Sequence, residues 1–128
     1  MRHTISYRVP YADVDRMGVV YYANYLVYFE RGRTEFLRDN GVPYRELEDS
    51  GVALPVIEAH CEYLKPARYD DLLTITTRAA EAKGVRIKLI CEVLRDGELL
   101  ARGHTWHACI GPGGRPVRVP EQLQRLAP

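Results

Sequence analysis

One segment, from about residue 22 to residue 39, has the hydrophobic period of an α-helix, and it most constrains how this chain can fold. Its apolar residues recur at i, i+3, i+4 and i+7 and form one stripe, made of Tyr22, Tyr25, Leu26, Phe29, Phe36 and Leu37. Asn40-Gly41 followed by Pro43 is a strong helix stop. Gly32 lies on or beside the stripe, and a mid-helix glycine costs about 1 kcal/mol relative to alanine. Its presence therefore predicts close approach of the helix to a packed sheet.

The other long segments have the pattern of strands. The predicted strands cover residues 3–10, 52–64, 70–81, 85–95 and 98–110. In one of them, apolar side chains alternate with polar ones and share a face, namely Val85, Ile87, Leu89, Cys91 and Val93. Asp96-Gly97 predicts a tight hairpin, because a type I′ turn requires positive φ at both central positions. We also expect a short helix over 43–49, and a brief strand with a helical turn over 117–126.

The order of these elements predicts one α+β domain over residues 1–128, in which an antiparallel sheet wraps around the long helix. A helix of about 18 residues is about 27 Å long, which is close to the width of a four- or five-stranded sheet. The helix covers only one face of that sheet. Because Trp106 and Ile110 fall on the other face, we expect that face to meet another copy of the chain.

Composition excludes several classes of function. The 18 Lys and Arg residues nearly balance the 17 Asp and Glu residues, so the formal net charge is +1. Bulk nucleic-acid binding needs many phosphates to be neutralised, so we do not expect it. The apolar runs are too short for a membrane-spanning helix, and the first residues lack the apolar core of a signal peptide. The three cysteines are scattered without a C-x-x-C pair, which predicts reduced thiols and a cytoplasmic location.

The densest polar cluster is Asp13-x-Asp15-x-x-Gly18, between the first strand and the long helix. A calcium loop is disfavoured, because such a loop needs an oxygen ligand where this chain has Met17 and a glutamate where it has Asn24. In a structural interpretation, one aspartate caps the helix and the other belongs to a turn. In a catalytic interpretation, a carboxylate beside a helix N-terminus attacks or activates water while free backbone N–H groups bind an oxyanion. Acyl transfer needs both groups.

The residues around this cluster resemble a known family. The stretch from Tyr11 to Tyr25, followed by Tyr28-x-Glu30-x-x-Arg33-x-Glu35, resembles the hot-dog-fold acyl-CoA thioesterases of the 4-hydroxybenzoyl-CoA thioesterase type, a group that includes the Tol–Pal-associated thioesterase. The later stretch Tyr63-x-x-Pro66-Ala67-Arg68-x-Asp70-Asp71 also fits this family. The resemblance covers nearly the whole chain. It implies a long central helix wrapped by a five- to six-stranded antiparallel sheet, and hydrolysis of a CoA thioester without a metal or organic cofactor.

Carried over by position, the resemblance assigns the chemistry to three residues. Asp15 is the catalytic carboxylate, as nucleophile or general base, and the backbone N–H of Tyr22 is the oxyanion donor. Gly18 lets the loop pass close to the thioester. Two positions depart from branches of the family: Tyr22 replaces the His of many envelope-linked members, and Arg16 replaces the Pro of the aroyl-CoA branch. The acyl group therefore stays open between aromatic and short aliphatic.

Further residues are candidates for substrate binding. Aromatic side chains around the cluster would exclude water and hold an apolar acyl group, and basic turns would hold the phosphates of CoA. We therefore assign substrate binding to Tyr11, Asp13, Tyr25, Lys65, Arg68, Lys83 and Arg86. Each basic residue taken singly is also compatible with a solvated turn.

Two other constellations are disfavoured by strand geometry. His104, His107 and Cys109 cannot converge on zinc, because His104 lies on the opposite strand face from the other two. His60 and Cys61 are strand neighbours that face opposite ways, so they do not form a catalytic dyad.

The sequence is also compatible with two other functions. One alternative is a non-catalytic module that binds acyl-CoA or an acyl-carrier protein. Another is a hydratase or dehydratase, which usually needs a histidine partner that residues 11–40 lack. The resemblance implies a dimer that assembles into a tetramer. A chain of 128 residues is too short for a deep interdomain cleft, so we expect the site to lie between two copies.

Overall fold

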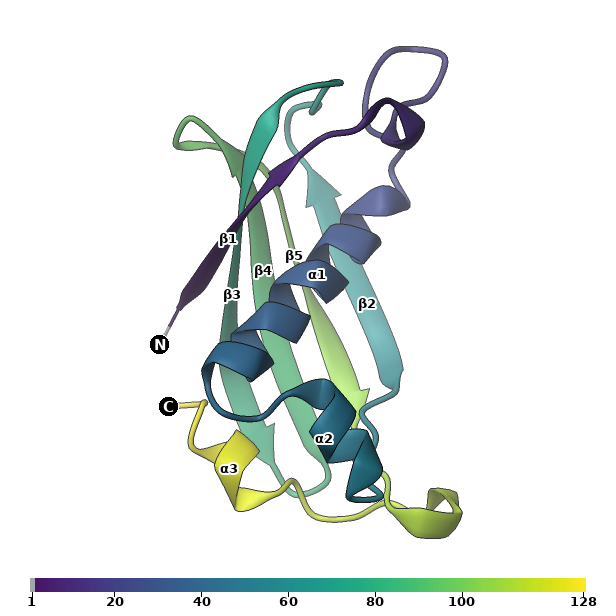
Figure 1. Cartoon of the computed structure of the whole chain (residues 1–128), viewed down its shortest axis with the longest axis vertical. Helices are drawn as coiled ribbons and strands as arrows, with labels where there is room; N and C mark the ends of the chain where they lie inside the picture. Colours follow the sequence, from purple (N-terminus) through teal and green to yellow (C-terminus); the bar gives the residue numbers. More distant parts are fainter. Residues whose placement is uncertain (1) are drawn as a thin grey trace.

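The computed structural model describes residues 2–128, which form an antiparallel sheet curved around one long helix (Figure 1). The helices and strands are β1 (His3–Arg8), α1 (Asn24–Asp39), α2 (Tyr44–Asp49), β2 (Val56–Tyr63), β3 (Leu72–Lys83), β4 (Arg86–Arg95), β5 (Glu98–Ala108) and α3 (Glu121–Gln124). Two short 3-10 turns lie at Tyr11–Asp13 and Pro112–Gly114. The predicted α+β class and the wrapped-helix architecture are confirmed.

The sheet has five strands in the order β1-β3-β4-β5-β2, and every neighbouring pair is antiparallel. β1 and β2 are therefore the two edge strands. α1 crosses the concave face of the sheet, and its N-terminal end lies at the same end of the molecule as the loop after β1 (Figure 1). That end also carries the β4–β5 hairpin and the connection from β2 to β3. Three segments far apart in the sequence thus meet at one end of the fold: the loop that leads into α1, the β2–β3 connection and the β4–β5 hairpin.

The core lies between α1 and the concave face of the sheet. The buried residues of β4 alternate as predicted, with Ile87, Leu89, Cys91 and Val93 facing inward, whereas Val85 just before the strand is exposed. Gly32 confirms the expected close approach, because a Cβ there would lie 2.6 Å from Thr77 Oγ1 and 2.9 Å from Ile75 Cγ2 on β3. Any larger side chain at this position would push the helix off the sheet.

The hairpin predicted at Asp96-Gly97 is also confirmed. Asp96 has φ of 51° and Gly97 has φ of 80°, which is the pair of left-handed conformations that a type I′ turn requires. The turn joins β4 to β5 and places Arg95 and Glu98 on either side of it. This local geometry matters for the site, because both side chains contact the connection between β2 and β3.

Several predicted boundaries were wrong. β1 ends at Arg8 rather than at residue 10, β3 covers Leu72–Lys83 rather than residues 70–81, and β5 ends at Ala108 rather than at residue 110. α1 begins at Asn24 rather than at residue 22, because the two preceding residues form a turn. β2 begins at Val56 rather than at residue 52, since Pro55 has no N–H to donate and Ala53 forms only an isolated bridge with Ile110. Residues 117–126 contain α3 but no strand in this structure.

Among residues 2–128, no helix covers the convex face of the sheet (Figure 1). On that face, the guanidinium of Arg86 lies 4.5 Å from the ring centroid of Trp106, and Lys88 Nζ lies 5.7 Å from it. Two cations thus flank the aromatic ring. The association of this face with another copy stays a prediction. Within residues 2–128, no helix combines the length and apolar character needed to span a membrane.

Candidate active site

The loop between β1 and α1 folds into a compact turn around Asp15. The Asp15 N–H donates to the Val19 carbonyl, and the Gly18 N–H donates to the Asp15 carbonyl, each at 2.9 Å. Gly18 has φ of 79°, a left-handed conformation that glycine adopts without strain. The turn is attached to the β2–β3 connection, since the Val20 N–H donates to the Ala67 carbonyl at 2.8 Å. Backbone hydrogen bonds therefore fix the shape of the turn that carries Asp15.

Asp15 lines a groove of about 310 Å³ at this end of the fold. The groove, called the Asp15 groove below, is lined by Asp15, Met17, Val19, Val20, Tyr22, Tyr25, Tyr63, Leu64, Lys65 and Pro66. Asp15 is the acidic member of this lining and Lys65 the basic one; the others are apolar or aromatic. One carboxylate oxygen of Asp15 accepts the Met17 N–H at 2.9 Å. The half-buried carboxylate thus has a single hydrogen bond to the protein among residues 2–128.

The start of α1 contributes backbone donors beside the same groove. The Asn24 N–H donates to the Tyr21 carbonyl at 2.9 Å, and the Tyr25 N–H donates to the Tyr22 carbonyl at 3.3 Å. The N–H groups of Tyr22 and Ala23 have no protein acceptor in the described part of the chain. Free N–H groups at a helix N-terminus attract negative charge, because they lie at the positive end of the helix dipole.

Asp13, two residues before Asp15, has a different environment. Its Oδ2 accepts hydrogen bonds from the Tyr28 hydroxyl at 2.7 Å and the Tyr7 hydroxyl at 2.9 Å. Its carbonyl accepts the Tyr21 N–H at 2.9 Å and Asn24 Nδ2 at 3.0 Å. Burial and the Asp13 carboxylate both raise the pKa of Tyr28. Asp13 therefore fastens the loop to β1 and α1.

This position corrects two expectations about Asp13. It does not line the Asp15 groove, because its carboxylate is turned toward the two tyrosines. The structure thus does not bring it together with the predicted substrate-binding residues. Neither aspartate is the helix cap of the structural interpretation, since the N-cap residue of α1 is Ala23, without a side-chain hydrogen bond.

Two tyrosines connect the walls of the Asp15 groove. The Tyr63 hydroxyl, at the end of β2, donates to the Tyr22 carbonyl at 2.9 Å. The Tyr25 hydroxyl accepts the Ala67 N–H at 3.3 Å. The two rings meet edge to face with centroids 5.1 Å apart. The sequence contained a signal for Tyr63, an aromatic residue at the end of a predicted strand, but did not indicate its contact with Tyr22.

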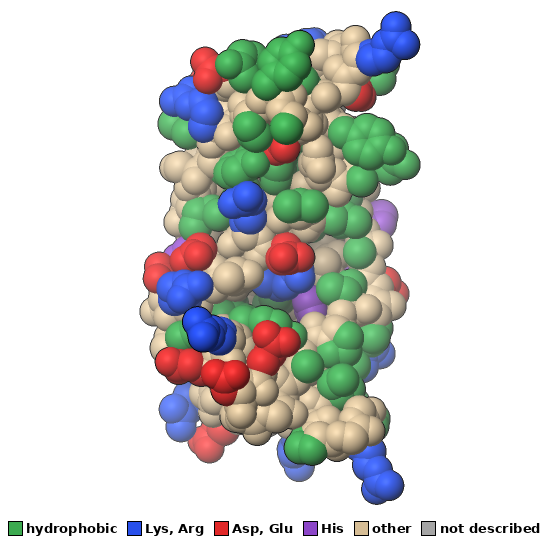
Figure 2. Space-filling view, turned by 45° about the vertical axis from the view of Figure 1, so that its right-hand side comes forward, with side chains coloured by type: hydrophobic (Ala, Val, Ile, Leu, Met, Phe, Trp, Pro, Cys, Tyr) green, Lys and Arg blue, Asp and Glu red, His purple; other side chains and the backbone are tan. Residues whose placement is uncertain are grey.

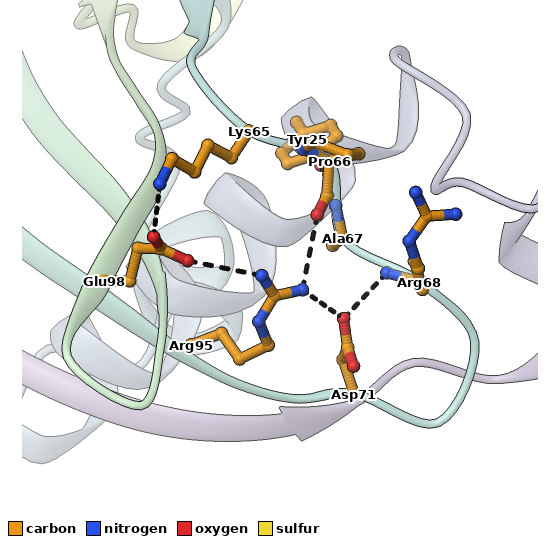
Figure 3. A network of polar contacts seen from close by, with 8 residues as sticks. All are labelled: Tyr25, Lys65, Pro66, Ala67, Arg68, Asp71, Arg95 and Glu98. Carbon is orange, nitrogen blue, oxygen red and sulfur yellow. Dashed lines mark hydrogen bonds and ion pairs between the residues drawn. The ribbon is translucent and has the colours of Figure 1, made fainter.

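A network of charged groups holds the outer wall of the groove (Figure 3). The Arg95 guanidinium donates to Asp71 Oδ2 at 2.8 Å and to the Pro66 carbonyl at 3.3 Å. Its other nitrogen donates to Glu98 Oε1 at 3.3 Å, and Glu98 also pairs with Lys65 at 2.5 Å. Burial alone would raise the pKa of Asp71, but the Arg68 N–H and Arg95 outweigh burial and lower this pKa. Sequence reasoning did not single out Arg95.

The predicted basic residues and Tyr11 are distributed over both ends of the molecule. Lys65 lines the groove, whereas the Arg68 side chain extends away from the network (Figure 3). Lys83 and Arg86 flank the β3–β4 turn, at the opposite end of the sheet from the β1–α1 loop (Figure 1). One chain alone therefore does not bring these two residues to Asp15. Tyr11 is 77% exposed, and its ring contacts Tyr69 rather than the groove.

The histidines and cysteines have the strand orientations that were predicted. His107 is buried, with Nδ1 2.9 Å from the Leu54 carbonyl and Nε2 2.8 Å from Thr105 Oγ1, whereas Nε2 of His104 lies 3.1 Å from Glu58. The His60 ring stacks on His104, while Cys61 packs against the core. Over residues 2–128, no three His, Cys, Asp or Glu side chains gather in a way that could hold a metal ion.

Comparison with known proteins identifies the family. Residues 9–126 match the model of the thioesterase-like superfamily. The acyl-CoA thioesterase YbgC of Haemophilus influenzae is 37% identical over 91% of this chain and 88% of its own. The 1,4-dihydroxy-2-naphthoyl-CoA hydrolase of Thermosynechococcus vestitus is 31% identical over 90% of this chain and 81% of its own.

A solved structure agrees with these relatives. The 1,4-dihydroxy-2-naphthoyl-CoA thioesterase from Synechocystis superposes with a TM-score of 0.89 at 25% identity, covering 98% of this chain and 95% of its own. Sequence and fold thus lead to the same group of enzymes, as the resemblance around the Asp15 loop predicted. The chain belongs to the thioesterase-like superfamily and is a thioester hydrolase with the hot-dog fold.

Proposed function

We propose that this protein hydrolyses an acyl-CoA thioester to the free carboxylic acid and CoA, with Asp15 as the catalytic carboxylate and the Tyr22 N–H as oxyanion donor. The observation that carries the proposal is that one apolar groove holds both groups. The Asp15 carboxylate accepts a single protein hydrogen bond, and the N–H of Tyr22, just before α1, has no protein acceptor within residues 2–128. A thioester carbonyl between them would be polarised by the N–H while the carboxylate acts on its carbon. Water exclusion by the apolar walls would strengthen both interactions.

Two routes use the same atoms. In the nucleophilic route, an Asp15 oxygen attacks the thioester carbon, the C–S bond breaks, and the CoA thiolate leaves and is protonated; water then hydrolyses the acyl-Asp15 anhydride. In the general-base route, Asp15 removes a proton from water as its oxygen attacks, and the proton passes to the departing thiolate. In both routes the Tyr22 N–H would stabilise the charge that develops on the carbonyl oxygen. A hydratase is less compatible with this site, since the described lining contains no histidine.

The lining of the groove indicates the class of acyl group. The lining presents the aromatic rings of Tyr22, Tyr25 and Tyr63. The Tyr63 and Tyr25 hydroxyls and the Tyr22 carbonyl already form hydrogen bonds within the protein. A volume of about 310 Å³ is at the lower end of the range for small-molecule sites. We therefore propose a compact, apolar or aromatic acyl group. The relatives named for 1,4-dihydroxy-2-naphthoyl-CoA act on an aromatic acyl group.

We further propose that the active form is a dimer that shares its sites and assembles into a tetramer. β2 is an edge strand with exposed Val56 and Ile57, and α1 exposes Leu26 and Val27. Figure 2 shows hydrophobic side chains gathered at the upper end and along the right-hand side of the face it presents. Burial of these side chains against a second copy would favour association.

The phosphates of CoA would lie on basic residues at the rim of this assembly. Lys65 is the closest candidate, because it lines the Asp15 groove, and Arg68 follows it in the same connection. Lys83 and Arg86 would contribute only from another copy, since they lie at the far end of their own sheet. A stable monomer with full activity would contradict the shared site.

The experiment that tests the function is a hydrolysis screen over short-chain, long-chain and aromatic CoA thioesters, with wild-type protein and Asp15→Asn. Loss of the carboxylate should lower kcat by about 10²- to 10⁴-fold for every substrate while CoA-thioester binding persists. Undiminished turnover by Asp15→Asn would contradict the assignment of Asp15. Binding of acyl-CoA or acyl-carrier protein without hydrolysis of any substrate by the wild type would instead favour a non-catalytic binding module.

A further inference from the structure

Tyr63 is the side chain that connects the end of β2 to the residue proposed to bind the oxyanion. We propose that the Tyr63 hydroxyl is a positioning group that orients the backbone at Tyr22, so that its removal slows the chemical step without weakening substrate binding. This inference rests on the proposed function of the Asp15 groove. Tyr63 itself does not carry the reaction, because it acts through the backbone of Tyr22.

The hydrogen bonds around Tyr22 show why a side chain is needed there. The peptide plane before Tyr22 is held by the Asn24 N–H, which donates to the Tyr21 carbonyl at 2.9 Å. The plane after it is held by the Tyr63 hydroxyl at 2.9 Å and by the Tyr25 N–H at 3.3 Å. This second plane carries the Ala23 N–H and meets the plane of the Tyr22 N–H at the Tyr22 Cα, so Tyr63 acts on the Tyr22 N–H only through that shared atom. Without Tyr63, only the longer of these two bonds would hold the second plane.

Packing does not replace this restraint. Tyr22 precedes the first residue of α1 and is 62% exposed, so neither the helical hydrogen-bond ladder nor the core fixes its dihedral angles. The contact of its ring with Tyr63 is edge to face at 6.5 Å between centroids, which is a loose contact. The hydroxyl bond from Tyr63 is therefore the short contact that links Tyr22 to the sheet.

Other roles for the Tyr63 hydroxyl fit the geometry less well. A phenol has one proton, and here that proton is donated to the Tyr22 carbonyl, so it is not free to stabilise an oxyanion. Burial and the neighbouring Cys61 raise the pKa of Tyr63 to about 12, so the group stays a protonated donor at neutral pH and is a poor general acid or base. The ring serves separately as a wall of the groove. Hydroxyl and ring thus have functions that substitutions can separate.

The test compares Tyr63→Phe with wild type on the best substrate of the screen. Removal of the hydroxyl should lower kcat about threefold to tenfold, which corresponds to one ordinary hydrogen bond, and should leave KM within twofold. The inhibition constant of a non-hydrolysable thioether analogue of that substrate should also stay within twofold. Tyr63→Ala, which removes the wall as well, should raise both KM and that inhibition constant.

The matched control is Tyr69→Phe. Tyr69 is an exposed tyrosine whose ring contacts Tyr11 outside the groove, and its hydroxyl has no protein hydrogen bond in the described chain. This variant should keep both kcat and KM. An independent readout is the backbone amide spectrum, in which the Tyr22 and Ala23 amide signals should shift in Tyr63→Phe and not in Tyr69→Phe.

The outcomes separate this inference from the proposed function. If the wild type hydrolyses none of the thioesters, the proposed function fails, whereas unmoved Tyr22 and Ala23 amides in Tyr63→Phe overturn the positioning role by themselves. If the wild type is active and Tyr63→Phe keeps its kcat, the inference is overturned. A rise in KM at unchanged kcat also overturns it, because Tyr63 would then be only a wall of the groove.

Discussion

Asp13 and Asp15 are two identical side chains two residues apart, and the structure gives them opposite environments. Asp13 points to the β1–α1 side of the loop, where two tyrosine hydroxyls donate to one of its oxygens. Asp15 points to the groove and has one backbone hydrogen bond within its own turn. The difference shows that the surroundings of a carboxylate, rather than its identity, decide whether it holds the loop in place or is available to a substrate.

The two sides of the loop also differ in what holds them. The Asp13 side depends on buried or half-buried contacts with Tyr7 and Tyr28, which water reaches poorly. The groove side depends on backbone bonds at Gly18 and on the partly exposed ion pairs of the Arg95 network. We therefore expect substitutions on the first side to change stability and those on the second side to change chiefly activity.

The largest stability effect is expected for Asp13→Ala. This change leaves two phenol hydroxyls without their acceptor, one of them on the buried Tyr28, and should lower the free energy of unfolding by about 2–4 kcal/mol. Asp15→Asn removes no contact with another element and should change it by less than about 0.5 kcal/mol. Urea unfolding of both variants measures the two values. Equal losses would contradict the division of roles.

A smaller effect is expected for Tyr28→Phe. The Tyr28 hydroxyl donates to Asp13 at 2.7 Å from a buried position, so its loss should cost about 1–2 kcal/mol. Tyr7→Phe is the matched comparison, because the same acceptor is used from a more exposed position. It should cost less than Tyr28→Phe in the same unfolding measurement. A larger loss of stability for Tyr7→Phe than for Tyr28→Phe would mean that burial does not control the strength of these two hydrogen bonds to Asp13.

Much of the fold could be predicted because its signals are local. The Asp96-Gly97 turn depends on two positive φ angles that its own residues favour, and Gly32 marks a close approach that any larger residue would block. The boundary errors arose where local signals compete with tertiary contacts. Pro55 delays β2, and the stretch after β5 is held by single bonds, such as the Val119 N–H to the Gly84 carbonyl, rather than by strand pairing.

The candidate site could be predicted only in part, for the same reason. The sequence placed an acidic pair before a helix but could not distinguish Asp13 from Asp15 by chemistry; the assignment came from the resemblance. What separates them is contact with Tyr7 and Tyr28, which is set by how β1 and α1 pack. The hydrogen bond from Tyr63 to Tyr22 joins residues 41 positions apart, and the local spacing of residues along a helix or strand does not predict such a contact.

Gly18→Ala tests the groove side with a modest expected effect. An alanine at φ of 79° is strained, and no atom lies within 4 Å of the added Cβ, so the cost should be the backbone strain of about 1 kcal/mol. Gly41→Ala is the matched control, because Gly41 has the same φ and equal space but lies after α1. Both variants should lose similar stability. Only Gly18→Ala should slow thioester hydrolysis, because strain at residue 18 would disturb the turn in which its N–H holds the Asp15 carbonyl. Equal rates would contradict a functional role for this turn.

The smallest effect is expected from pH, and of the two sides of the loop it should concern the groove side. Arg95, with the Arg68 N–H, lowers the pKa of Asp71 against the effect of burial, and Lys65 followed by Arg95 lowers the pKa of Glu98. A depressed carboxyl pKa stabilises the folded state above the unfolded pKa, near 4, and this stabilisation is lost as pH falls through the lower folded value.

Thermal unfolding between pH 6 and pH 3 measures this loss. Arg95→Met should remove less than about 1 kcal/mol at neutral pH, since the Arg95–Asp71 pair is partly exposed, and should flatten the decline below pH 4. Arg125→Met is the matched control, because Arg125 forms an exposed pair with Glu121 far from the groove, and it should leave the decline unchanged. Added salt should reduce the stability that the Arg95 pairs give the wild type, as the substitution does, because salt screens these ion pairs. Salt should screen the hydrogen bonds of Asp13 to Tyr28 and Tyr7 less. An Arg95 variant that declines as steeply as wild type would show that the groove wall does not depend on these charges.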